Sequence, residues 1–121
     1  MDPAESTYGA SVFASVLRVW NGNDPAAIRA LLTDDYRGHM LHLADGERTA
    51  LDYSAWIERF RRDHPGVQFE VVSQIVDGDR VWSRLLARRP DGAMANGMNE
   101  SRMREGLLAE EWALWSGWQR P

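Results

Sequence analysis

A short stretch near the C-terminus, GMNESRMREGLLAEEWALW at 97–115, contains an amide, two acids and an indole. Asn99 comes early in it, and Glu110, Glu111 and Trp112 come late. A carboxylate held in an apolar site has a raised pKa and can accept a proton as a general base. Asn99 has no useful pKa, but its amide N–H groups can donate to a developing enolate oxygen. The stretch is compatible with two interpretations: proton-transfer chemistry in a small-molecule pocket, or polar residues that are simply exposed to solvent.

The two acids must point to opposite faces of one strand, because side chains alternate along a strand. In one register Glu110 and Trp112 face the interior. In the other, Glu111 faces the interior together with Ala113 and Trp115. The inward Glu is the best candidate for a general base, and the alternative is that a strand bulge leaves both acids in solvent. Both Glu residues therefore stay candidates for catalysis, and Trp112 for ligand binding.

Two histidines lie three residues apart in the predicted strand 35–43, DYRGHMLHL, so they point to opposite sides. They cannot bind one metal ion together, and no third ligand is spaced to help, so no metal site is expected. His39 is a candidate acid–base group or hydrogen-bond donor. Tyr36 and Met40 share a face with His42 or with the cavity and are candidate ligand contacts.

The elements that must position these residues begin with three helices, each recognised by a helical apolar periodicity. The predicted segments are residues 6–20, a segment that starts at 24–25, and residues 51–64. The third has an apolar stripe at i, i+3, i+4 and i+7, formed by Tyr53, Trp56, Ile57 and Phe60. We expect Tyr53, Trp56 and Phe60 to lie in the core or against a ligand.

Alternating residues predict strands at 67–71 and 81–88, and two further strands follow at 93–104 and 107–116. Turn residues separate them, such as Asp77-Gly78-Asp79. Helices segregated from an antiparallel sheet indicate the α+β class. We expect the sheet to curl around the third helix and leave a cone whose open end binds a small molecule.

The composition of the chain limits the classes of protein to which it can belong. The 121 residues fit a single domain spanning 1–121, with 44% apolar and 26% charged residues. The net charge is −4, which argues against nucleic acid as a partner. No apolar run is long enough for a membrane span, and no secretory signal is visible. There is no Cys, so a cytoplasmic location is the natural expectation.

Six Trp residues are many for this length. Trp20, Trp56 and Trp112 fit the core or a pocket. Trp82, Trp115 and Trp118 are predicted to lie on the other face of the sheet, where exposed indoles would form an apolar patch. Such patches usually mark an interface, so a homodimer through the sheet face is expected.

The order of elements resembles the NTF2-like superfamily, and within it the SnoaL-like polyketide cyclase family. The matching stretches are 20–40, 64–85 and 97–115, of which the last is the most specific. Members tend to have Gly-apolar-Asp, then an apolar-Arg pair, a turn Gly, and Glu-x-Trp. Here Asn99 stands in the position of the Asp, which is the family's catalytic acid–base, and Glu110 and Trp112 match the Glu-x-Trp. His39 matches a His that members often have in an early strand.

The resemblance implies a cone-shaped fold, cofactor-free acid–base chemistry on a carbonyl compound, and a homodimer. The reactions of the family and its wider relatives are aldol ring closure, isomerisation, dehydration and epoxide hydrolysis. The chain departs from the pattern at Asn99 and in the loop ARRPDGAMANG, which is short and has no His. Two hypotheses follow: a cyclase, isomerase or dehydratase of secondary metabolism acting on a hydrophobic carbonyl compound, or a non-catalytic module that binds a small molecule or dimerises.

Overall fold

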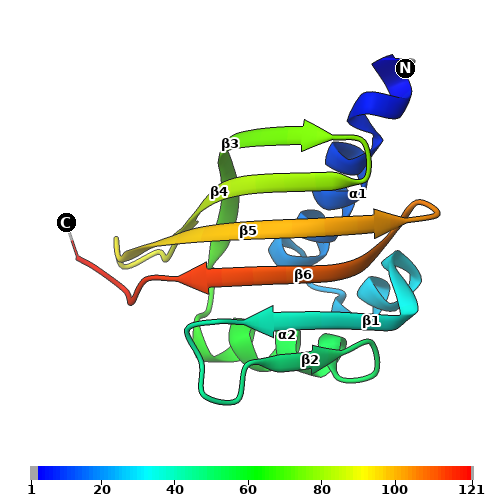
Figure 1. Cartoon of the computed structure of the whole chain (residues 1–121). Helices are drawn as coiled ribbons and strands as arrows, with labels where there is room; N and C mark the ends of the chain where they lie inside the picture. Colours follow the sequence, from blue (N-terminus) through cyan, green and yellow to red (C-terminus); the bar gives the residue numbers. More distant parts are fainter. Residues whose placement is uncertain (1–2, 121) are drawn as a thin grey trace.

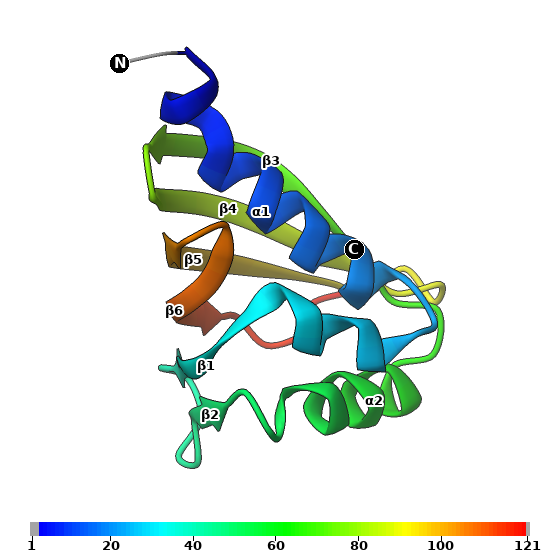
Figure 2. The ribbon, with the colours of Figure 1, turned by 90° about the vertical axis from the view of Figure 1, so that its right-hand side faces the viewer.

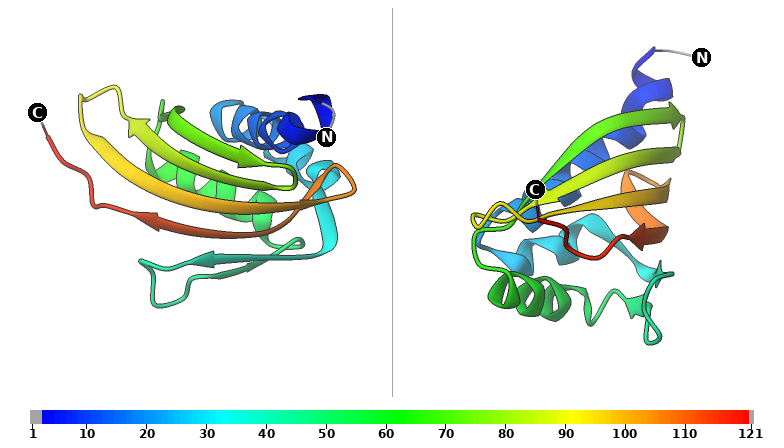
Figure 3. Two further views of the ribbon diagram at one scale, coloured as in Figure 1. Left: turned by 45° about the horizontal axis from the view of Figure 1, so that its top comes forward. Right: turned by 90° about the vertical axis from the view of Figure 1, so that its left-hand side faces the viewer.

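The computed structural model describes residues 3–120, with side chains from Tyr8 onward. Its helices are α1 (Pro3–Asn21), the 3-10 helix η1 (Pro25–Leu31) and α2 (Tyr53–Asp63). Its strands are β1 (Leu32–Met40), β2 (Glu47–Thr49), β3 (Gln68–Asp77), β4 (Arg80–Arg88), β5 (Met94–Arg104) and β6 (Leu107–Trp115). These strands form one curved sheet in the order β2-β1-β6-β5-β4-β3, with the helices on one side (Figure 1, Figure 3). Within residues 3–120, no helix is both long enough and apolar enough to cross a membrane.

The predicted α+β class, with a curved sheet over helices, is confirmed, and two details of the sheet differ. β1 pairs in parallel with β6, so that Gly38 lies opposite Glu111 and His39 opposite Trp112. A parallel pair needs a long connection, which the elements between β1 and β6 supply. The edge strand β2 was not predicted, because three residues are too few to show a periodicity.

The helix that crosses the concave face is α1, which contacts β3, β4, β5 and β6 (Figure 2). The prediction that the third helix fills the curled sheet was wrong, because α2 packs mainly against η1. Its apolar stripe still turns inward, since Tyr53 and Ile57 are fully buried. Both helices therefore form walls of the space under the sheet.

Two apolar clusters fill this space. The larger one joins α1, η1, α2 and the middle of the sheet through residues such as Ile28, Tyr36 and Ile57. The smaller one lies around Val67 at the other end of the sheet. Trp115 packs against both clusters. The candidate site lies where side chains of the two clusters face each other.

Candidate functional site

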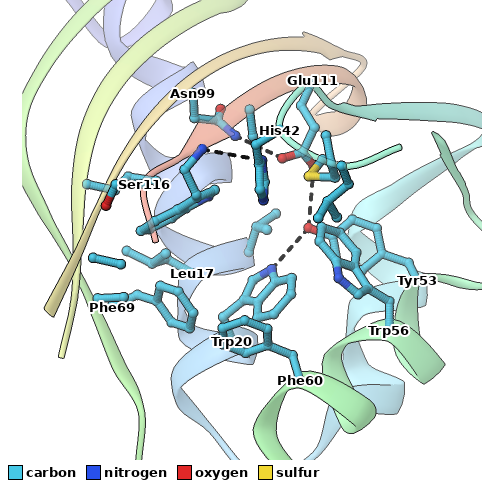
Figure 4. A pocket seen from close by; sticks show the side chains of 18 of the residues that line it. Leu17, Trp20, His42, Tyr53, Trp56, Phe60, Phe69, Asn99, Glu111 and Ser116 are labelled. Atoms are coloured by element: carbon cyan, nitrogen blue, oxygen red, sulfur yellow. Dashed lines mark hydrogen bonds between the residues drawn. The ribbon is translucent and has the colours of Figure 1, made fainter. Parts of the chain in front are cut away.

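A cavity of about 310 Å³ lies between the concave face of the sheet and the helices α1 and α2. This volume is at the lower end of the range for small-molecule pockets, roughly 300–1,000 Å³. Its walls are largely aromatic and include Phe13, Trp20, Tyr53, Trp56, Phe60, Phe69, Trp115 and Trp118. The polar or ionisable side chains besides Tyr53 are His42, Asn99, Glu111 and Ser116 (Figure 4).

Asn99 and Glu111 reach the cavity from neighbouring strands. Alternate residues of β5 face inward, and Asn99 is one of them, with 8% of its surface exposed. On β6 the inward residue is Glu111, which is 5% exposed. The two residues are diagonal neighbours, because Ser101 lies opposite Glu111 and Asn99 opposite Ala113. Asn99 Nδ2 donates to Glu111 Oε1 at 2.9 Å.

The carboxylate of Glu111 accepts three hydrogen bonds. Besides the bond from Asn99 to Oε1, the Tyr36 hydroxyl donates to Oε2 at 2.9 Å and the Tyr53 hydroxyl donates to the same atom at 3.3 Å. A carboxylate has about four acceptor sites, two on each oxygen. The three donors therefore leave one site, which is on Oε1.

Two further side chains, those of Ser101 and Trp20, orient two of these donors through hydrogen bonds of their own. The Ser101 hydroxyl donates to Asn99 Oδ1, so the amide nitrogen of Asn99 must face Glu111. Trp20 Nε1 donates to the Tyr53 hydroxyl at 3.0 Å, which directs the Tyr53 proton towards Glu111. One amide hydrogen of Asn99 is used by Glu111, and the other remains for a ligand.

Burial raises the pKa of Glu111, and the hydrogen bonds from Asn99, Tyr36 and Tyr53 oppose that rise. The positive charge of His39 also lowers this pKa. Burial raises the pKa values of both tyrosines, and the nearby Glu111 charge adds to the effect, so both hydroxyls stay neutral donors. Glu111 thus combines a raised pKa with an open acceptor site at the cavity.

At two glycines, an aromatic side chain approaches the backbone so closely that a Cβ would not fit. A Cβ on Gly38 would lie 2.2 Å from the Tyr36 hydroxyl oxygen, so the absent side chain leaves room for that hydroxyl beside Glu111. A Cβ on Gly97 would lie 2.5 Å from the indole of Trp115, which covers Gly97 as a wall of the cavity.

His42 follows β1 and contributes to the cavity wall from an exposed position. Its Nδ1 accepts a hydrogen bond from the backbone N–H of Trp115 at 3.3 Å, which places the proton of a neutral ring on Nε2. Burial of part of the ring lowers its pKa, and the charge of Arg48 lowers it further. His42 was considered at the sequence level but not selected as a site residue.

Three predicted site residues lie on the outer face of the sheet. Glu110 and Trp112 alternate with Glu111 on β6, so they point away from the cavity. His39 also points outward, stacked on Trp112 at 5.3 Å, with Nε2 2.8 Å from Glu110 Oε2 and Nδ1 2.7 Å from Glu47 Oε2. These hydrogen bonds raise the pKa of His39, the bond to Glu110 most. Of the two registers that the sequence left open, the structure has the one with Glu111, Ala113 and Trp115 facing inward.

Among the predicted ligand contacts, Met40, Tyr53, Trp56 and Phe60 form part of the cavity wall. Tyr36 is buried beneath Glu111 and is absent from the wall, although its hydroxyl reaches the carboxylate. Two indoles predicted on the outer face, those of Trp115 and Trp118, form part of the wall instead. Trp115 follows the register of Glu111, and Trp118 lies beyond the last strand, where alternation gives no guidance.

Sequence reasoning also missed Phe13 and Phe69 and left Trp20 between core and pocket. Trp20 lies on the apolar face of α1, and that periodicity cannot distinguish a core residue from a cavity wall. No group of three or more His, Asp or Glu side chains in the described part of the chain is placed to hold a metal ion.

Replacing Gly38 by Ala should displace the Tyr36 ring and break its hydrogen bond to Glu111. Overpacking of this kind lowers the free energy of unfolding by about 1–3 kcal/mol. Gly117→Ala is the matched control, because a Cβ there meets nothing within 4 Å. Urea denaturation of both variants measures the difference, and equal stability would contradict the role given to Gly38.

The comparisons with known proteins agree with this architecture. A family model for the SnoaL-like domain matches residues 13–111. No curated protein sequence matches the chain. Similar solved structures include a proposed polyketide cyclase from Bacillus cereus, with 18% identity and a TM-score of 0.81, where 96% of this chain covers 79% of the other.

Two more structures are IdmH, a proposed polyketide cyclase from Streptomyces antibioticus, and a proposed ketosteroid isomerase from Kribbella flavida. Each is 19% identical, with TM-scores of 0.78 and 0.76. The shared regions cover 89% of this chain and 91% of IdmH, and 97% of this chain and 84% of the Kribbella protein. At such identities the likeness concerns the fold. The family model covers most of the sequence, and the chain belongs to the SnoaL-like domain family.

Proposed function

We propose that this protein is a cofactor-free acid–base enzyme of secondary metabolism that acts on a hydrophobic carbonyl compound, as a polyketide cyclase, isomerase or dehydratase would. The observation that carries the proposal is the Glu111 carboxylate, which is buried at an aromatic cavity and keeps one acceptor site free. The cavity accepts an apolar substrate, and this carboxylate supplies a base inside it.

In the proposed reaction Glu111 Oε1 takes a proton from the carbon next to the substrate carbonyl. Desolvation makes the carboxylate a stronger base than it would be in water, which is the direction of its pKa shift. The tyrosine donors hold Oε2, so the proton arrives on Oε1 at the cavity side. The same atom can return the proton to another position of the substrate, as isomerisation requires, or to an oxygen that leaves.

Asn99 has two tasks in this scheme. One amide hydrogen holds Glu111 Oε1 in place at 2.9 Å. The other can donate to the enolate oxygen that forms when the substrate loses its proton. An ionised Asp at this position could do neither, because a carboxylate has no hydrogen to donate. Asn99 thus suits an enzyme whose base is Glu111.

Removal of the base tests the proposal. Deuterium exchange next to the carbonyl of aryl-substituted ketones such as 2-tetralone, followed by NMR in D₂O, reports proton abstraction without knowledge of the natural substrate. Glu111→Gln should slow exchange by about 10²–10⁴-fold, the usual contribution of a positioned base. Wild-type exchange should also fall as pH drops through the raised pKa of Glu111, since the base acts when ionised.

Glu110→Gln is the control, because it removes the same charge from the outer face and should leave exchange unchanged. The stability of Glu111→Gln shows whether slow exchange comes from the missing base or from an unfolded protein. A raised pKa in the folded state means that Glu111 stabilises the fold below its unfolded pKa, and this contribution disappears as pH rises through the folded value. Glu111→Gln should therefore be at least as stable as the wild type at neutral pH. Wild-type protein without exchange but with ligand binding would favour the non-catalytic alternative.

Substitutions of Asn99 test the second role. Asn99→Ala should slow the deuterium exchange by about 10²–10³-fold, as expected for loss of an oxyanion donor. Asn99→Asp places a second carboxylate beside Glu111 Oε1, so the two acids should share a proton and the acid limb of the pH profile should move to higher pH. If the pH dependence of the exchange rate is the same in Asn99→Asp as in the wild type, the residue at position 99 does not influence the pKa of Glu111. That result would contradict the role given to this contact.

The outer face of the sheet is a separate surface, for which we propose self-association. Four apolar side chains on β3 to β6 are well exposed there: Ile75 at 69%, Trp82 at 37%, Met98 at 58% and Leu114 at 51%. Trp82 lies opposite Ile75, and Met98 lies opposite Leu114. Covering this surface removes apolar area from water at about 25 cal/mol per Å².

A homodimer through this face should sediment as a single dimeric species at micromolar concentration. Trp82→Glu should shift it towards monomer, because a charge would be buried in the contact. Leu51→Glu is the control, since Leu51 is 86% exposed but lies between β2 and α2, outside the strands of this face. A wild-type protein that sediments only as monomer would rule out the dimer.

A further inference from the structure

We propose that the cavity also binds an ammonium cation with apolar substituents, with the Glu111 carboxylate as its counter-ion. This goes beyond the proposed reaction, because the ligand needs no carbonyl group and undergoes no chemistry. It rests on two features of the cavity: a buried carboxylate without an ionic partner, and aromatic rings next to it.

The charge balance is the first feature. Glu111 is 5% exposed, and its three hydrogen-bond donors are neutral groups. None of the side chains around the cavity is an Arg, the sequence contains no Lys, and Glu111 takes part in none of the ion pairs found among residues 8–120. A buried charge without a counter-charge is unfavourable. A cation placed at the free site of Oε1 would supply the missing charge.

The aromatic surface is the second feature. Trp20, Tyr53 and Trp56 pack together edge to face in the cavity wall, with ring centroids 4.8 Å apart for Trp20 and Trp56, 4.9 Å for Tyr53 and Trp56, and 6.0 Å for Trp20 and Tyr53. The Tyr53 hydroxyl is 3.3 Å from Glu111 Oε2, so this group of rings adjoins the negative charge (Figure 4). Rings of this kind attract ammonium groups through their negative faces, and quaternary ammonium ligands are commonly held by several such rings.

Other charges near the cavity are compatible with a cationic ligand. His42 is neutral near pH 7, because partial burial lowers its pKa. Tyr53 is a neutral donor. The Arg48 guanidinium lies 5.0 Å from the ring centroid of Trp56 and covers part of that indole, although Arg48 is not part of the cavity wall. Its positive charge opposes a second cation on Trp56, so Trp20 and Tyr53 are the rings left for the ligand. His39 lies on the outer face, where its contacts to Glu110 and Glu47 raise its pKa and place two carboxylates next to the ring.

The test compares two probes of the same shape, choline and 3,3-dimethylbutan-1-ol, in which a carbon replaces the charged nitrogen. Trp20, Trp56, Trp115 and Trp118 are part of the cavity wall, so intrinsic fluorescence at constant ionic strength reports binding of both probes. The wild type should bind choline about tenfold more tightly than the alcohol, as desolvated cation–π contacts and a counter-ion predict.

Two variants and a pH series locate the cause of this preference. Glu111→Gln should lose most of the preference for choline and keep only the part that the aromatic rings supply. Glu110→Gln, which removes the same charge from the outer face, should keep the wild-type preference. Wild-type affinity for choline should rise as pH increases through the raised pKa of Glu111, and affinity for the alcohol should not.

Equal affinities in the wild type, no binding of either probe, or a preference for choline that is undiminished in Glu111→Gln would each overturn the inference. Deuterium exchange on the same wild-type protein separates it from the proposed function. Exchange without a preference for choline would support Glu111 as the base and contradict the cation site. A preference for choline without exchange would support the cation site and contradict the base.

Discussion

The carboxylate of Glu111 lies in an apolar interior, where a charged group is unfavourable unless hydrogen bonds satisfy it. Its donors come from three different elements: Asn99 from β5, Tyr36 from β1 and Tyr53 from α2. The parallel pairing of β1 with β6 brings Tyr36 under the carboxylate, and Gly38 leaves the room that the Tyr36 hydroxyl needs. The order of the sheet and the position of α2 are thus tied to one buried acid.

The adjacent acids of β6 show how one strand can give two similar side chains different properties. Glu110 faces outward and contacts both His39 and Arg102, at 2.8 and 2.7 Å, so cations balance its charge. Glu111 faces inward and has only neutral donors, and burial raises its pKa. A base that must act on an apolar substrate belongs on the inner face, because only there is a carboxylate both desolvated and next to the cavity.

The residue types of the site could be predicted from the sequence, but the faces to which they point could not. The strand LLAEEWALW has apolar residues at both odd and even positions, so alternation could not choose between Glu110 and Glu111. Glu110 and Trp112 match the Glu-x-Trp of the family, but in the structure Glu111 is the acid that faces the cavity. Trp20 and Trp118 come from elements distant in sequence, and only the folded chain shows that they face one cavity.

The proposed base depends on one property: Glu111 is a desolvated carboxylate at the cavity, and burial raises its pKa. A ¹³C NMR titration of the Glu side-chain carboxyl carbons, assigned by comparison with Glu111→Gln, measures this directly. We expect Glu111 to titrate clearly above the ordinary pKa of about 4.3 for Glu. A Glu111 signal that titrates at or below this value would show that its hydrogen-bond donors outweigh burial, and would contradict its role as the base.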